Sequence, residues 1–231
     1  MLSQLILDLN QLQNSSKAKI LSGFFKTAPG QYGEGDIFLG ITVPQQRQIA
    51  KKYLLISLDD IQTLLHSPIH EQRLTALIIL TEQYKKATSD QQHQIYHFYL
   101  KNAQHINNWD LVDGSAPYIP GQYLLHKPKD ILYQLAQSNN LWEKRIAIVS
   151  TFAFIRNNQF QPTLDISKIL IHDQHDLIHK AIGWMLREVG KRNQALLEKF
   201  LNWNLKHLPR TTLRYAIEKF PTEKRRYYLK K

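Results

Sequence analysis

The chain contains no cysteine among its 231 residues. Disulfide bonds, zinc sites built on thiolates and thiol nucleophiles are therefore excluded. Long apolar runs are also missing, because stretches such as 76–80 are far too short to span a bilayer. The first residues have no basic segment, and Asp8 interrupts their apolar run, which argues against a signal peptide. We therefore expect a soluble, cytoplasmic protein.

Acidic residues are scarce relative to basic ones. Nineteen Asp and Glu stand against thirty Lys and Arg, which gives a formal net charge of +11 at pH 7. Such an excess favours a polyanionic partner, because phosphates release condensed counterions when basic side chains neutralise them. A basic, solvated surface without a partner explains the charge about equally well. Charge alone therefore makes nucleic acid a candidate partner and no more.

The alternation of apolar and polar residues that marks half-exposed strands is absent over any useful length, whereas helical spacing is common. In 2–12, apolar residues recur every three or four positions, which predicts one buried helix face. Ser57, with Asp60 three residues later, is typical of a capped helix start. The stretch 27–36 contains three Gly and a Pro, which break regular structure, so it is predicted to be a loop.

Basic residues recur at a regular interval before apolar helical segments, at Arg73, Arg145, Lys180 and Arg214. The last two intervals are 35 and 34 residues, the first is 72, or twice 36, and 36 residues beyond Arg73 lies Trp109. This period predicts two-helix units, as in HEAT-type solenoids. We therefore predict an all-α fold, an α–α superhelix of HEAT-like repeats with a concave basic face.

One domain over 1–231 is expected, with N-terminal helices in 1–26, a loop at 27–36 and repeats in 37–231. Equivalent positions of stacked repeats line up, so the four basic residues would form a stripe spaced to follow a phosphate backbone. The alternative for each residue is that it caps a helix or pairs with a nearby carboxylate such as Glu71 or Glu143.

Few residues have the spacing of a catalytic site or a metal site. Trp109 and Asp113 are four residues apart and share a helix face, although a core Trp beside a surface Asp is the commoner explanation of such a pair. Trp184 would ordinarily be assigned to the core as well. No catalytic dyad or nucleotide-binding loop is visible, and His172 with His175 lacks a supporting carboxylate pattern. No metal and no cofactor are expected.

At these residues the chain resembles the AlkD-like family of DNA alkylation repair glycosylases. The likeness lies in separated motifs that follow one another in the same order, at 24–27, 32–41, 44–47, 108–113, 142–145, 180–188 and 213–219. The likeness extends over nearly the whole chain, and several separated motifs in the right order make the match specific.

The resemblance implies that Asp113 is the catalytic carboxylate, with Trp109 and Trp184 against the sugar–phosphate backbone at the lesion. The DNA-binding residues expected from it and from the basic repeat are Arg145, Lys180, Arg187, Arg214 and Arg47. The implied substrate is double-stranded DNA carrying N7-alkylguanine or N3-alkyladenine, whose N-glycosidic bond is hydrolysed in base excision repair. A monomer is expected to suffice.

The residue types suit this chemistry. An alkylated purine is cationic and already a good leaving group, so that no general acid is needed. A carboxylate such as Asp113 stabilises the developing oxocarbenium ion of the sugar, and it can position or deprotonate the attacking water. Tryptophan π faces favour a cationic sugar by up to about 2 kcal/mol when desolvated.

Two other readings stay open at this point. A non-catalytic DNA-binding solenoid explains the charge and the basic repeat equally well. A protein-binding HEAT scaffold is the third reading, and it predicts binding that is insensitive to salt. The basic and aromatic run 224–231 adds either phosphate affinity or only a solvated tail.

Overall fold

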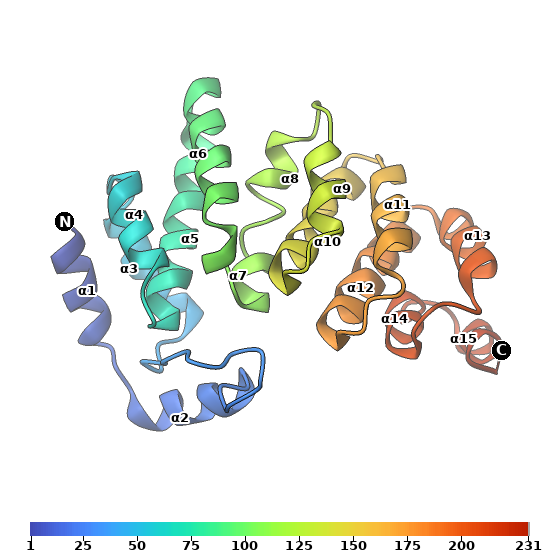
Figure 1. The fold of residues 1–231 in the computed structure, drawn as a ribbon, viewed down its shortest axis with the longest axis horizontal. Helices are drawn as coiled ribbons and strands as arrows, with labels where there is room; N and C mark the ends of the chain where they lie inside the picture. The colour runs from blue at the N-terminus through green and yellow to red at the C-terminus, as the bar shows by residue number, and fades with distance from the viewer. Residues whose placement is uncertain (231) are drawn as a thin grey trace. The chain divides into compact units, whose positions relative to one another are not determined.

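A computed structural model describes residues 1–230, which form α-helices joined by turns and loops (Figure 1). Within these residues no β-strand occurs, and the one isolated β-bridge pairs Ile37 with Ile69. The predicted all-α class is confirmed, and the helices are consistent with an α–α superhelix. HEAT-type repeats and a concave basic face stay predictions.

The chain divides into two compact units, Met1–Ser115 and Ala116–Lys231. Lys231, the last residue of the predicted single domain and of the basic run 224–231, lies outside the described residues. The prediction of one domain is not decided by this division. Each unit is described separately below.

The first unit contains α1 (Leu2–Asn10), α2 (Ser15–Phe24), α3 (Val43–Lys52), α4 (Leu58–Leu65), α5 (His70–Lys86), α6 (Ser89–Lys101), the 3-10 helix η1 (Ala103–His105) and α7 (Trp109–Asp113). The predicted helix at 2–12 is α1, which buries Leu5 and Leu9. The predicted start at Ser57 is also confirmed, because its side chain accepts a hydrogen bond from the Asp60 N–H at 3.1 Å.

Helix α5 forms the centre of this unit. Every residue from 70 to 81 is buried, because α3, α4, α6 and α7 all pack against the helix. Residues such as Leu77, Ile79 and Leu80 are at most 2% exposed. Each such side chain contributes roughly 1.5–3 kcal/mol of burial free energy. The tight packing of α5 therefore fixes the positions of the residues at its N-terminal end, such as His70 and Arg73.

The non-helical segment after α2 runs over 25–42 and is longer than the predicted loop at 27–36. Its end packs closely on α2: Gly40 has φ +85°, and a Cβ atom there would lie 2.2 Å from the Asn14 carbonyl oxygen. The buried Glu71 carboxylate accepts hydrogen bonds from the three N–H groups of 39–41, at 2.8 to 3.2 Å. The close packing of Gly40 on the start of α2 and the hydrogen bonds to the Glu71 carboxylate of α5 therefore hold the end of this segment in place.

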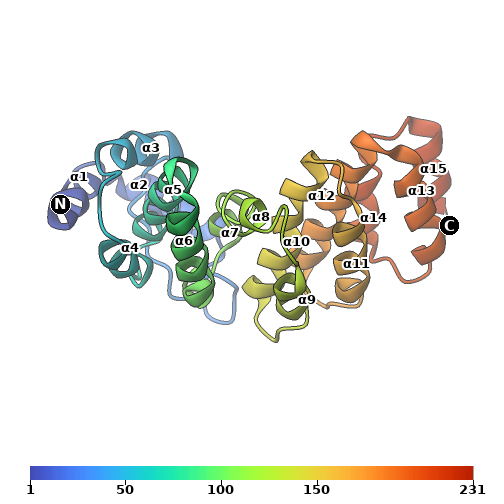
Figure 2. The same cartoon turned by 90° about the horizontal axis from the view of Figure 1, so that it is seen from above.

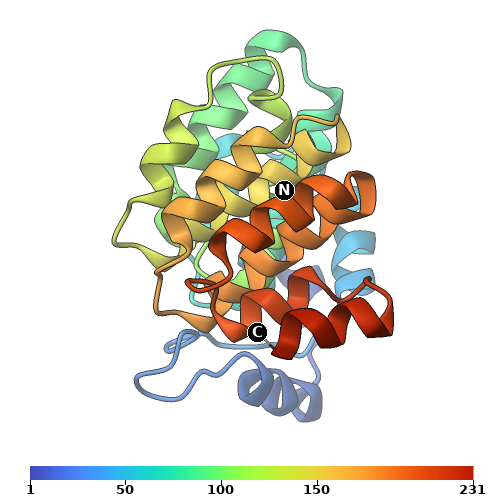
Figure 3. The same cartoon turned by 90° about the vertical axis from the view of Figure 1, so that its right-hand side faces the viewer.

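The second unit contains α8 (Pro120–Tyr123), α9 (Asp130–Ala136), α10 (Leu141–Arg156), α11 (Gln161–Leu170), α12 (Asp176–Arg192), α13 (Gln194–Asn204), α14 (Arg210–Ala216) and α15 (Thr222–Lys230). Consecutive helices pair, α9 with α10 and α11 with α12, and α10, α12 and α14 pack in succession (Figures 2 and 3). Arg145, Lys180 and Arg214 each lie about one turn into α10, α12 and α14. The sequence period therefore matches a structural period in this unit.

Helices α12 and α14 pack closely against each other at Gly183. A Cβ atom at this position would lie 2.4 Å from Tyr215 Cβ and 2.7 Å from the Thr212 carbonyl oxygen, so no larger residue fits. The Thr212 hydroxyl also donates a hydrogen bond to the His179 carbonyl at 3.0 Å. The close packing of α14 on α12 is therefore the physical reason for a glycine in the motif at 180–188.

Candidate functional site in the first unit

Helix α7 carries two of the predicted site residues. It begins at Trp109 and ends at Asp113, and both side chains are half-buried rather than sealed in the core. The Asn108 side chain caps the helix by accepting a hydrogen bond from the Trp109 N–H at 2.8 Å. The Asp110 carboxylate accepts one from the Leu111 N–H at 2.9 Å. The spacing of four residues therefore places Trp109 and Asp113 on one helix, as predicted.

The Trp109 ring packs on the end of α2 and the residue that follows it. It stacks on Phe25, with ring centroids 5.2 Å apart and an interplanar angle of 16°, and meets Phe24 edge-on at 6.0 Å. Phe24 is 62% exposed, whereas Phe25 is buried. The half-buried Trp109 indole therefore contacts one buried ring, Phe25, and one exposed ring, Phe24.

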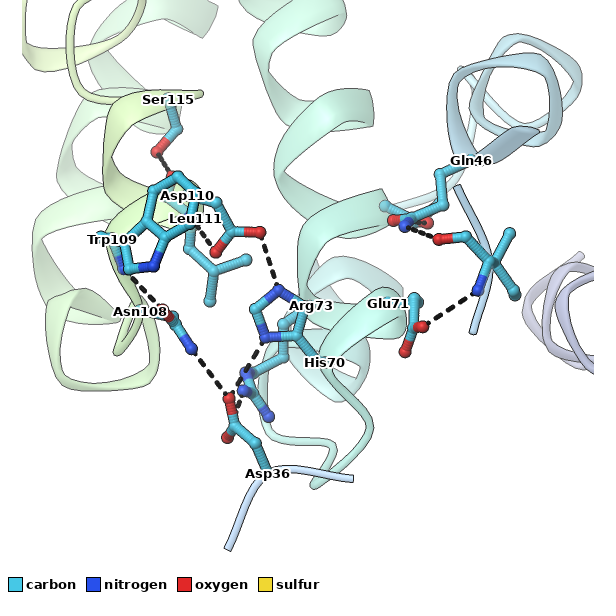
Figure 4. A network of polar contacts seen from close by, with 12 residues as sticks. Asp36, Gln46, His70, Glu71, Arg73, Asn108, Trp109, Asp110, Leu111 and Ser115 are labelled. Carbon is cyan, nitrogen blue, oxygen red and sulfur yellow. Dashed lines mark hydrogen bonds and ion pairs between the residues drawn. The ribbon is translucent and has the colours of Figure 1, made fainter. Parts of the chain in front are cut away.

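A buried polar network lies beside α7 (Figure 4). His70, the first residue of α5, makes hydrogen bonds to Asp36 Oδ2 through Nδ1 at 3.2 Å and to Asp110 Oδ2 through Nε2 at 2.8 Å. Asp36 also accepts hydrogen bonds from Arg73 at 2.6 Å and from the Asn108 amide at 3.1 Å. The network therefore joins the segment 25–42, α5 and α7.

Burial and charge oppose each other at His70. Burial alone would lower the pKa of the imidazole, but the hydrogen bonds to Asp110 and Asp36 outweigh it and raise the pKa to about 9. Burial alone would raise the pKa of Asp36, but the hydrogen bond from His70 and the charge of Arg73 leave it lowered. At neutral pH the network is therefore a set of charged, mutually paired groups.

The end of α7 is held by a second set of contacts. The Ser115 hydroxyl donates to the Leu111 carbonyl at 2.6 Å and shares a hydrogen bond with the Tyr99 hydroxyl at 2.9 Å. Burial raises the pKa of the Tyr99 phenol, and the negative charge of Asp113 raises it further. Tyr99 therefore stays neutral at physiological pH.

Sequence reasoning missed the partners in this network. It placed Arg73 in a surface stripe, and this prediction is wrong, because Arg73 is 3% exposed. The alternative, a pair with a carboxylate, is confirmed, with Asp36 as the partner instead of Glu71. Nothing in the local spacing of His70 or Asp36 singles them out. Asp36 and Asp110 lie inside the motifs 32–41 and 108–113 of the resemblance, which was the only signal available for them. The last predicted residue of this unit, Arg47, is exposed on α3.

In the second unit, Arg145 on α10 reaches the first turn of α12. Its guanidinium is buried and donates a hydrogen bond to the Leu177 carbonyl at 2.6 Å. Lys180 and Trp184 are both half-buried and lie one turn apart on α12, and the Trp184 ring contacts Phe152 at 5.9 Å. This unit therefore brings Arg145 to the first turn of α12, the helix that carries Lys180 and Trp184.

The remaining basic residues of this unit differ in their partners. Lys180 pairs with Asp176 at 2.8 Å, and Arg187 pairs with Glu218 and, at 3.6 Å, with Glu188. Arg214 is exposed on α14. The predicted phosphate contacts of these residues, and of Arg145, stay predictions.

Charge is distributed unequally between the units. Residues 1–115 contain ten Lys and Arg and ten Asp and Glu, whereas 116–231 contain twenty and nine. The full net charge of +11 therefore belongs to the second unit, and the unit with α7 is neutral overall. A polyanion would be attracted chiefly by the second unit.

Residues 1–230 contain neither a cluster suited to a metal ion nor a membrane-spanning helix. No group of three or more His, Asp or Glu side chains in this part of the chain is arranged to hold a metal ion. The helices described there are all too short or too polar to cross a membrane.

Comparison with known proteins gives matches of two kinds, to a solved structure and to a family model. A solved structure described as a predicted DNA alkylation repair enzyme from Enterococcus faecalis is similar with a TM-score of 0.71 and 17% identity, covering 91% of this chain and 97% of the other. At this identity the likeness shows the fold alone. Among proteins with curated descriptions, none matches the sequence. The family model described as DNA alkylation repair enzyme matches residues 5–220. The chain therefore belongs to the DNA alkylation repair enzyme family, and its role is in the repair of alkylated DNA.

Proposed function

We propose that the protein is a DNA glycosylase that removes cationic alkylated purines, N7-alkylguanine and N3-alkyladenine, from double-stranded DNA. The observation that carries the proposal is that one short helix holds both a half-buried carboxylate, Asp113, and a half-buried indole, Trp109. Family membership supports DNA as the molecule acted on. These two groups are the ones that a developing sugar cation requires.

The reaction replaces one bond with another. The bond between C1′ of the deoxyribose and the purine nitrogen breaks, and its electron pair neutralises the cationic base. Water then forms a bond to C1′ and loses a proton, which Asp113 or solvent accepts. Because the leaving base is already cationic, no second carboxylate is needed as an acid, unlike in most glycoside hydrolases. Asp113 stabilises the cationic sugar, and the face of Trp109 lies against it.

Base release from a duplex with a single N7-methylguanine tests the proposal. With enzyme in excess, we expect free N7-methylguanine and an abasic site. An undamaged duplex and a duplex with uracil, whose base is neutral, are expected to release nothing, because selectivity depends on the charge of the base. If folded protein binds the damaged duplex without releasing its base, the chain is a binding protein and the proposed activity is wrong.

Duplex binding is expected to depend on the basic residues of the second unit. Arg214→Ala should weaken the binding of damaged and undamaged duplex alike, and reduce the slope of log affinity against log salt by about 1, because one phosphate contact is lost. Lys86→Ala, which removes an exposed charge from the neutral first unit, is the matched control and should leave the slope unchanged. Equal slopes for wild type and Arg214→Ala would remove Arg214 from the proposed interface.

A further inference from the structure

Helix α7 cannot set its own orientation. It has five residues, whereas an isolated helix needs roughly 12–15 to be even marginally stable in water. The side chains at its two ends, Trp109 and Asp113, are the groups assigned to the chemistry above. Their positions therefore depend on what holds α7 against the rest of the first unit.

The contacts of the His70 side chain show that this residue holds α7 in place. Both ring nitrogens face carboxylate oxygens, Asp36 Oδ2 and Asp110 Oδ2. An ionised carboxylate only accepts hydrogen bonds, so both nitrogens must carry a proton, and the ring is an imidazolium. His70 is 2% exposed, and the Phe25 and Phe38 rings lie over it at 4.9 and 4.6 Å. The cation is thus shielded from water and bridges two anions.

The bridge links α7 to the two other parts of the site. Asp110 is the second residue of α7, and Asp36 also binds the Asn108 side chain that caps the same helix. On the other side, Phe25 contacts both the His70 ring and the Trp109 ring. If His70 lost its charge, its hydrogen bonds to Asp36 and to Asp110 would both weaken. The segment 25–42 and the first turn of α7 would then be held together less firmly.

We propose that His70 is a positioning residue for catalysis: its imidazolium, held between Asp36 and Asp110, fixes α7 and with it Trp109 and Asp113. The inference rests on the proposed function. The charged groups that face the ring are Asp36 from the segment 25–42, Asp110 from α7 and Arg73 from α5. The neighbouring Glu71 is engaged by the backbone of 39–41.

His70→Gln tests the proposal. Glutamine donates from one end of its amide only and turns its oxygen toward the other carboxylate. We expect the single-turnover rate of base release to fall roughly a hundredfold, as for other small displacements of catalytic groups, with duplex affinity unchanged. His97→Gln, an exposed histidine on α6, is the control and should keep the wild-type rate. A folded His70→Gln protein with the wild-type rate overturns the proposal.

Asp110→Asn provides a second variant in case His70→Gln does not fold. It removes one of the two anions that hold the proton on His70, so the alkaline fall in rate should begin at a lower pH than in wild type. Asp90→Asn is matched in charge and in its place in the first turn of a helix, and should leave the pH profile unchanged. An unshifted profile in Asp110→Asn counts against His70 as the controlling group.

A spectroscopic measurement separates this inference from the proposed function. In nitrogen–proton correlation spectra, His70 should show two ring N–H groups at neutral pH, and its deprotonation should change the resonances of Trp109. Both results are expected even if no base is released from any duplex, in which case only the glycosylase proposal fails. A single ring N–H at neutral pH, or a Trp109 environment unchanged in His70→Gln, overturns the positioning role directly.

Discussion

Asp113→Asn is expected to slow the release of N7-methylguanine by on the order of a hundredfold to a thousandfold. Asparagine has almost the same shape as aspartate but no negative charge, so the developing sugar cation loses its electrostatic partner and water loses its base. Duplex affinity should be unchanged or slightly higher, because a negative charge is removed. Single-turnover rates and equilibrium binding, measured on the same damaged duplex, separate the two effects.

The control for this variant is Asp59→Asn, which removes an exposed carboxylate from α4 in the same unit. It should keep both the rate and the affinity of wild type. If Asp113→Asn instead releases base at the rate of Asp59→Asn, the carboxylate of Asp113 has no catalytic role. If it unfolds, the Asp113 side chain is structural, and its proposed role has to be judged from Asp113→Glu, which keeps the charge.

The stability of the first unit is expected to fall by on the order of 3 kcal/mol between pH 6.5 and pH 9. The pKa of His70 is about 9 in the folded protein, against 6.5 for an ordinary histidine. Folded protein therefore holds the proton more tightly than unfolded protein does. The resulting stabilisation is complete below pH 6.5 and is lost as the pH rises through about 9.

Urea unfolding at several pH values measures this loss. Trp109 is the only tryptophan of residues 1–115, so a variant with Trp142, Trp184 and Trp203 replaced by phenylalanine reports on the first unit alone. In this background His70→Gln should be less stable at neutral pH and nearly independent of pH in the same window. A wild-type stability that stays level from pH 6.5 to pH 9 would show that His70 is not charged in the folded protein.

Much of the local structure followed from the sequence alone. Helical spacing in 2–12 predicted α1, and the Ser57 cap predicted the start of α4, because both depend on residues within about one turn of each other. The four-residue spacing of Trp109 and Asp113 placed them on one helix for the same reason. The interval between Arg145, Lys180 and Arg214 likewise matched the spacing of α10, α12 and α14.

Only the tertiary structure decided which charges are exposed and which are paired. Asp36 and His70 are 34 residues apart, and His70 and Asp110 are 40 apart, so no periodicity within a helix relates them. Arg73 has the spacing of a surface stripe, yet packing of α5 on all sides buries it against Asp36. Local patterns are set by neighbouring residues and the helical repeat, whereas a buried ion network depends on which segments the folded chain brings into contact.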